Sequence, residues 1–162
     1  MANICEFQMK VIGKTKEDIE KFYKYLSQDG NIYMGRGAGA VIDEIKKDGN
    51  EFVALISGDC KWSITASLIL NAISMREEPK IWSFGNIDSS SLRFVTLFEA
   101  CEELGLDIEV YSSEPGCCFQ EHIICKHGEV VVDDCVDYFE DYDEETDEIT
   151  STGGYSSWDF EI

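Results

Sequence analysis

The chain has 162 residues, 44% of them hydrophobic and 12% aromatic, which is enough to build the core of one domain. Its formal net charge is −20, from 33 acidic and 13 basic residues. That charge argues against direct binding of DNA, RNA or an anionic membrane, because such binding depends on Lys and Arg. The sequence has no apolar stretch of about 20 residues to cross a membrane, and its N-terminus lacks the pattern of a signal peptide. We therefore expect a cytoplasmic protein, and seven cysteines without a CxxC motif favour reduced thiols.

The first elements are predicted from hydrophobic periodicity. Apolar and polar residues alternate over 4–12, which indicates a half-buried strand. Thr15 is a suitable N-cap for a helix that ends near Gly30, since apolar residues recur at helical spacing between them. The next ten residues, 31–40, are rich in glycine.

The middle of the chain predicts a short helix and a hairpin. Residues 40–47 favour the helix, and residues 52–56 read as a buried strand. A turn at 57–59 would lead into a second hairpin arm at 62–68. Residues 70–88 show no clear pattern, so we expect a packed loop there.

A second amphipathic helix is predicted to begin at Ser89 or Ser90 and to end at Gly105, a typical C-cap residue. Residues 106–111 favour a strand. Two further strands, 118–125 and 130–132, are predicted to form a hairpin through 126–129. The apolar stripe of this helix is Leu92, Val95, Phe98, Cys101 and Leu104.

The resulting order is β-α-β-β-α-β-β. It predicts an α+β sandwich, in which both helices cover one face of an antiparallel sheet in the split βαβ arrangement. We expect this domain to occupy residues 1–132, with an extra C-terminal strand, and an acidic extension to occupy residues 133–162.

Several short segments resemble the YubB ferredoxin-like family of phage and plasmid proteins. They are MANICEF at 1–7, KWS at 61–63, LFEACEELGLDIEVYSSEPG at 97–116 and KHGE at 126–129. Ile4 stands where that family usually has Trp. The resemblance covers residues 1–132 and implies a ferredoxin-like fold without an iron–sulfur cluster, in proteins of bacterial mobile elements. It implies no catalytic residues.

The segment 117–127 contains three cysteines and both histidines of the chain. In one strand, Cys117 and Cys125 would lie about 26 Å apart, too far for one zinc ion. Cys118 and His122 would lie about 13 Å apart, too far for a nucleophile and its base. We therefore expect structural thiols here, with no metal and no catalytic residue.

The loop 33–40 reads YMGRGAGA and has neither the Lys nor the spacing of a P-loop. A flexible turn is the simpler interpretation. A nucleotide role remains the alternative, with Arg36 as the anion contact.

The acidic end is the most conspicuous feature of the sequence. Residues 133–162 hold twelve acids and no Lys or Arg, while the other 21 acids and all 13 bases lie in 1–132, which carries only −8. An EF-hand does not fit, because Thr146 and Thr152 stand where Gly and Glu are required. Aromatic residues among the acids suggest that the tail packs on its own domain or docks on a partner. A solvated face with a few anchoring rings is the alternative. The predicted partner-binding residues are Asp133, Asp134, Asp137, Glu140, Asp141, Asp143, Glu144, Glu145, Asp147, Glu148, Tyr138, Tyr142 and Trp158.

These patterns predict a non-enzymatic interaction protein without a cofactor, acting in the cytoplasm of a bacterial host cell. Its partner would be a protein with a basic nucleic-acid-binding surface, which the negative surface blocks as a DNA mimic does. A host defence nuclease such as a CRISPR effector is one example, which would make the chain an anti-CRISPR protein. The alternatives are a small ligand- or nucleotide-binding domain or enzyme, using the loop 33–40 and the Cys/His hairpin, and a module that self-associates through its sheet.

Overall fold

The computed structural model describes residues 3–156 and residue 160. Its strands and helices follow in chain order. They are β1 (Ile4–Gly13), α1 (Lys16–Leu26), β2 (Ile32–Met34), β3 (Gly39–Asp48), β4 (Glu51–Lys61), the π-helical segment η1 (Thr65–Leu70), α2 (Asn71–Glu77), the 3-10 turns η2 (Pro79–Ile81) and η3 (Ser89–Ser91), β5 (Arg93–Val95), α3 (Leu97–Leu104), β6 (Asp107–Glu114), β7 (Phe119–Lys126), β8 (Glu129–Asp143) and β9 (Glu148–Gly153).

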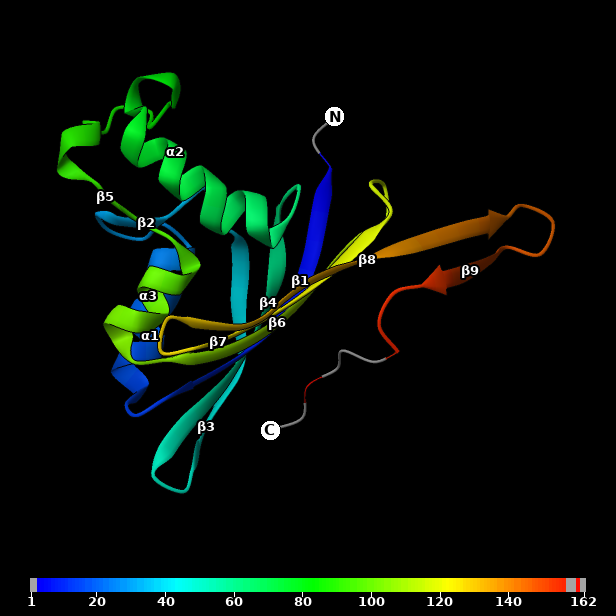
Figure 1. Ribbon diagram of the computed structural model, residues 1–162, viewed down its shortest axis with the longest axis horizontal. Helices are drawn as coiled ribbons and strands as arrows, with labels where there is room; N and C mark the ends of the chain where they lie inside the picture. Colours follow the sequence, from blue (N-terminus) through cyan, green and yellow to red (C-terminus); the bar gives the residue numbers. More distant parts are fainter. Residues whose placement is uncertain (1–2, 157–159, 161–162) are drawn as a thin grey trace.

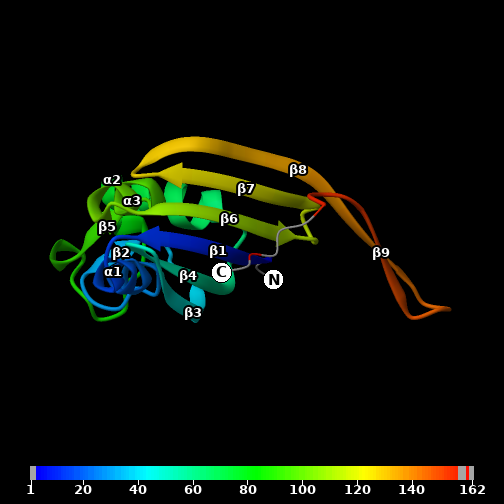
Figure 2. The same cartoon turned by 90° about the horizontal axis from the view of Figure 1, so that it is seen from below.

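A curled antiparallel sheet of seven strands dominates the molecule, in the order β3-β4-β1-β6-β7-β8-β9 (Figures 1 and 2). β2 and β5 form a separate parallel pair beside it. Register shifts at Ile42/Glu44 and Ile124/Cys125 mark two bulges. Bulges increase the local twist, which helps a long sheet to curl.

The hydrophobic core lies between one face of the sheet and the helices. Phe7 and Met9 of β1 and Ile123 of β7 point toward this side and are almost fully buried. Phe22 from α1 and Leu97 from α3 cover them. Each such side chain contributes about 1.5–3 kcal/mol by leaving water.

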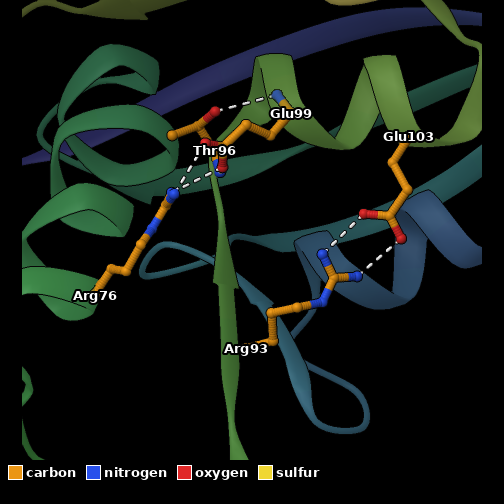
Figure 3. Close-up of polar contacts among 5 residues, drawn as sticks. All are labelled: Arg76, Arg93, Thr96, Glu99 and Glu103. Atoms are coloured by element: carbon orange, nitrogen blue, oxygen red, sulfur yellow. Dashed lines mark hydrogen bonds and ion pairs between the residues drawn. The ribbon is translucent and has the colours of Figure 1, made fainter.

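The two main helices begin at the residues whose side chains cap them. Thr15 accepts a hydrogen bond from the Asp18 amide, which confirms the predicted N-cap of α1. α3 begins after Thr96, which forms a capping box with Glu99, and ends at Gly105 in the left-handed conformation, as predicted. Ion pairs Arg76–Glu99 and Arg93–Glu103 tie α3 to α2 and β5 (Figure 3).

The predicted ferredoxin-like sandwich is wrong. The structure is a larger curled sheet with few helices, because β7, β8 and β9 extend it on one side and η1 and α2 add a helical segment beyond α1 and α3. β8 starts at Glu129 and runs to Asp143, across residue 132 where we placed the end of the domain.

Two local predictions between residues 40 and 68 are also wrong. Residues 40–47 form part of β3 rather than a helix, because they pair with β4 and the bulge at Ile42/Glu44 shifts their alternation. Residues 65–70 are helical rather than the second arm of a hairpin. The carboxylate of Glu121 accepts hydrogen bonds from the amides of Ile64 and Thr65, which favours a helix start at that point.

Residues 70–95 differ from the sequence prediction as well. The expected loop contains α2, and Leu92 and Val95 precede α3 instead of belonging to its apolar stripe. Trp82 and Phe84 pack against a small second core formed by Tyr33, Met75 and Phe94. The capping box at Thr96 sets the start of α3, so the serines at 89 and 90 do not cap it.

Candidate partner-binding surface

A two-stranded hairpin projects from the body of the sheet and carries most of the C-terminal acids. We call the segment from Asp137 to Gly153, which comprises the end of β8, the turn 144–147 and β9, the acidic arm. Figures 1 and 2 show it extending away from the helices. Asp133 and Asp134 lie at its base, where β8 still pairs with β7. All ten predicted carboxylates between 133 and 148 are exposed.

The register of the arm concentrates its charge on β8. Asp141 pairs with Thr150 and Glu140 with Ser151, so acids face short hydroxyl side chains across the hairpin. The one cross-strand pair of two acids is Asp143 with Glu148, next to the turn. Like charges directly opposite each other destabilise a sheet. Placing most of the acids opposite hydroxyl side chains therefore limits the repulsion within the arm.

Aromatic side chains accompany the acids on both faces of the arm. Phe139 is 50% exposed and shares a face with Asp137 and Asp141. Tyr142 is 55% exposed and lies on the opposite face with Glu140. The Tyr142 hydroxyl donates to Asp147, which raises the pKa of Tyr142. The arm therefore exposes rings and carboxylates on both of its faces.

The chain turns back from the arm toward the open face of the sheet. Gly153 has φ +80°, and a Cβ there would lie 2.5 Å from the Asp137 carbonyl, so only glycine fits this turn. The next residues pack Tyr155 edge-on against Tyr111 and His122. Burial and the nearby Asp134, which accepts a hydrogen bond from the Tyr155 hydroxyl, raise the pKa of Tyr155.

The structure separates the predicted partner-binding residues into two groups. The arm brings together eight acids with Tyr138 and Tyr142, while Asp134 at its base contacts Tyr155. Tyr138 is half-buried, and its hydroxyl donates to Glu140 at 2.7 Å. Trp158 lies outside the described residues.

The Cys/His hairpin has its reactive groups on different surfaces. Cys117 and Cys118 lie in the turn before β7, whereas Cys125 is buried against Cys101. His122 stacks on Tyr111 with ring centroids 4.0 Å apart and contacts Glu109 at 2.9 Å on the open face. No group of three or more His, Cys, Asp or Glu residues suited to a metal ion occurs among residues 3–156 and 160.

Two buried thiol pairs lie in the core. Cys5 and Cys60 are direct cross-strand partners on β1 and β4. Their hydrogen bond lowers the pKa of Cys5 and raises that of Cys60. The hydrogen bond from Cys101 likewise lowers the pKa of Cys125, and the pKa of Cys101 is raised.

Sequence reasoning missed Glu121, a buried carboxylate that joins β7 to the start of η1. It is only 5% exposed and also accepts a hydrogen bond from Ser112 at 2.6 Å. A signal for it was present, because Glu121 alternates with Ile123 and Cys125 and so belongs to the inward face of a predicted strand. A carboxylate at an inward position requires partners.

Comparison with known proteins gives no relative from which function can be read. Neither family models, nor curated proteins, nor solved structures match this chain. The resemblance to the YubB ferredoxin-like family therefore stays a prediction. Within the described part of the chain, no helix has the length and apolar character needed to cross a membrane.

Proposed function

We propose that this protein is a non-enzymatic interaction protein whose acidic arm occupies a basic nucleic-acid-binding groove on another protein. The observation that carries the proposal is the arm itself, a projecting hairpin with exposed carboxylates and exposed rings. Such a groove offers Lys and Arg for the carboxylates and stacking positions for the rings. The mechanism is steric and electrostatic competition with the nucleic acid.

The spacing of the charges favours a groove that holds a single strand. Residues 133–143 of β8 span about 34 Å at the rise of an antiparallel strand. Six carboxylates lie along this length, about one per 6 Å, and Glu144, Glu145 and Asp147 follow in the turn. This spacing is closer to that of a single strand than to that of a duplex. Each single strand of DNA has one charge per about 3.4 Å along its axis, whereas the duplex has one per about 1.7 Å.

The arm is also suited to gain stability from a partner. An isolated two-stranded hairpin is marginally stable in water, and among the described strands β9 pairs only with β8. Cations of a basic groove would relieve the repulsion between the acids and cover Phe139, Tyr142 and Ile149, which are all at least 50% exposed. Binding and ordering of the arm would therefore reinforce each other.

The resemblance to proteins of phages and plasmids suggests where such a groove is found. A defence nuclease of the bacterial host, such as a CRISPR effector, has a groove of this kind and is the first candidate partner. An anti-CRISPR role as a DNA mimic in the host cytoplasm is thus one form of the proposed function.

A capture experiment with matched charge variants tests the proposal. The full chain is immobilised beside an arm variant, in which five acids become amides, and a body variant with the same change in charge. The arm variant carries the changes at Glu140, Asp141, Asp143, Glu144 and Glu145. The body variant carries them at Asp43, Glu44, Asp48, Glu51 and Glu77, which are all exposed.

The three immobilised proteins are incubated with candidate nucleases. Any nuclease that they retain is then eluted with a single-stranded oligonucleotide or by raising the salt from about 50 to about 200 mM. We expect the wild type and the body variant to retain a nuclease that the oligonucleotide releases, and the arm variant to retain at least about tenfold less. Equal retention by the arm and body variants would exclude the arm as the binding element. Retention that the oligonucleotide does not reverse would exclude competition for the groove.

A further inference from the structure

Arg36 occupies an unusual position in the loop between β2 and β3. Its guanidinium carbon lies 5.8 Å from the ring centroid of Trp62 and 5.7 Å from that of Trp82. One ring directly follows β4 and the other directly follows η2, so three separate parts of the chain meet at one cation. Cation–π contacts of this kind help to hold the side chain in place.

The guanidinium of Arg36 keeps its hydrogen-bond donors available. Arg76 and Arg93 each form a two-pronged ion pair with a glutamate, as Figure 3 shows. In the described ranges no carboxylate forms such a pair with Arg36, although the chain has 33 acids. A guanidinium has five N–H donors in a planar fork that matches a phosphate or carboxylate.

The loop around Arg36 is fixed by its own backbone. The Arg36 amide donates to the Ser67 carbonyl and the Gly37 amide to the Met34 carbonyl. A Cβ at Gly35 would lie 2.0 Å from the Ser67 oxygen, so the loop packs directly against η1. These amides are therefore not free to cradle a phosphate, and recognition of an anion falls to the Arg36 side chain.

A hollow of about 450 Å³ opens beside this side chain. Its lining combines Arg36 with the rings of Tyr33, Trp82 and Phe84 and the amide of Gln28. The indole of Trp82 is oriented by its hydrogen bond to Ser74 Oγ at 3.0 Å. The polar side chains of Gln28, Arg36 and Ser83 lie beside these rings. A hollow of this size that combines aromatic rings with a few placed polar groups can hold a small molecule.

The backbone of Trp62 has a strained conformation. Its φ is +76°, which a residue other than glycine rarely adopts. Strained backbone conformations of this kind concentrate at functional sites. Here the conformation places a half-exposed ring, 51% accessible, over the cation rather than in the core.

We propose that the hollow beside Arg36 binds a small aromatic anion with one phosphate group, of the class of nucleoside monophosphates. The phosphate contacts the guanidinium of Arg36, and the base packs against the aromatic lining. One arginine balances one phosphate better than it balances a triphosphate, since the protein has a net charge of −20. The lining of the hollow contains no residue of the acidic arm. A test of this site therefore gives a result that is independent of the function proposed for the arm.

Binding is measured by calorimetry with adenosine monophosphate, and with adenosine and inorganic phosphate as separate probes. We expect adenosine monophosphate to bind with a dissociation constant below about 1 mM. Arg36→Gln should weaken binding at least tenfold, or about 1.4 kcal/mol. Lys80→Gln removes the same charge from an exposed nearby position outside the lining and should leave binding within about twofold.

A spectroscopic readout keeps the test valid if Arg36→Gln fails to fold. In the wild type, adenosine monophosphate should shift the indole N–H resonance of Trp82 and leave the amide resonances of the acidic arm in place. Absence of binding at about 10 mM would overturn the proposal. So would equal affinity for adenosine, which shows that the anion is not recognised, or for inorganic phosphate, which shows that the ring is not.

Discussion

The buried carboxylate of Glu121 provides the sharpest test of how the helical segment is held on the sheet. It accepts hydrogen bonds from the amides of Ile64 at 2.9 Å and Thr65 at 3.2 Å, and from the hydroxyl of Ser112 at 2.6 Å. Two of these donors are amides at the start of a helix, where an amide has no acceptor within the helix itself. The third donor belongs to β6. Glu121→Gln keeps the size of the side chain but replaces one accepting oxygen with an amide that donates.

The cost of Glu121→Gln follows from this geometry. At least one hydrogen bond to a charged group is lost, and its donor stays buried, which costs about 1.5–3 kcal/mol. With a urea dependence of about 2 kcal/mol/M for a domain of this size, the unfolding midpoint should fall by about 1 M. The free energy of unfolding of a typical domain is about 5–15 kcal/mol, so the variant still folds.

Urea titration followed by tryptophan fluorescence measures this shift, and Trp62 lies only two residues before Ile64. Glu129→Gln is the matched control, because Glu129 is exposed and its midpoint should change little. If Glu121→Gln and Glu129→Gln unfolded at the same urea concentration, the carboxylate would not be what holds η1 on the sheet.

Two further substitutions test the fold around α3 and η1. The hydrogen bond from Arg93 lowers the pKa of Glu103 from 4.5, so the pair stabilises the protein above pH 4.5 and loses this effect as the pH falls through the lowered pKa. Glu103→Gln should therefore cost up to about 1 kcal/mol at neutral pH, since the pair is partly exposed, and a urea titration in acid should bring the two curves together. Gly35→Ala meets the Ser67 oxygen at φ +56°, whereas Gly49→Ala meets nothing within 4 Å at φ +59°. We expect a cost of about 1–2 kcal/mol for Gly49→Ala and clearly more for Gly35→Ala by thermal unfolding, and equal melting temperatures would contradict the close approach of the loop to η1.

Local signals predicted some of the elements correctly. Apolar and polar residues alternate over 5–11, and this segment lies in β1, an interior strand of the sheet. Thr15 and Gly105 cap their helices because a hydroxyl oxygen and a left-handed backbone satisfy helix ends locally. Their effect does not depend on distant parts of the chain, so it could be read from the sequence.

The wrong predictions concern segments whose structure depends on distant partners. Residues 40–47 form a strand because β4 lies beside them. The start of η1 is set by Glu121 of β7, which accepts hydrogen bonds from the amides of Ile64 and Thr65. The predicted fold class was wrong for the same reason. The sheet continues through β7, β8 and β9, and the periodicity of a single strand does not specify which strands pair.

The sequence analysis did not predict a strand within the acidic end. The residues 149–152, Ile-Thr-Ser-Thr, are β-branched at three of four positions, and a pair of glycines follows them. This pattern favours a strand with a turn after it, and the structure forms β9 there. The dense charge hid this signal, since runs of like charge are usually disordered.

We propose that the acidic arm and a nucleic acid compete for one groove of the partner. The most direct test of this competition is displacement of a fluorescent single-stranded oligonucleotide from the captured nuclease, by wild type and by the arm and body variants. We expect full displacement by the wild type and the body variant, and at least about tenfold weaker displacement by the arm variant, with all affinities falling as salt rises. Displacement by the arm variant equal to that by the wild type would show that the arm does not compete with the nucleic acid. A complex in which oligonucleotide and protein bind the nuclease together would show the same.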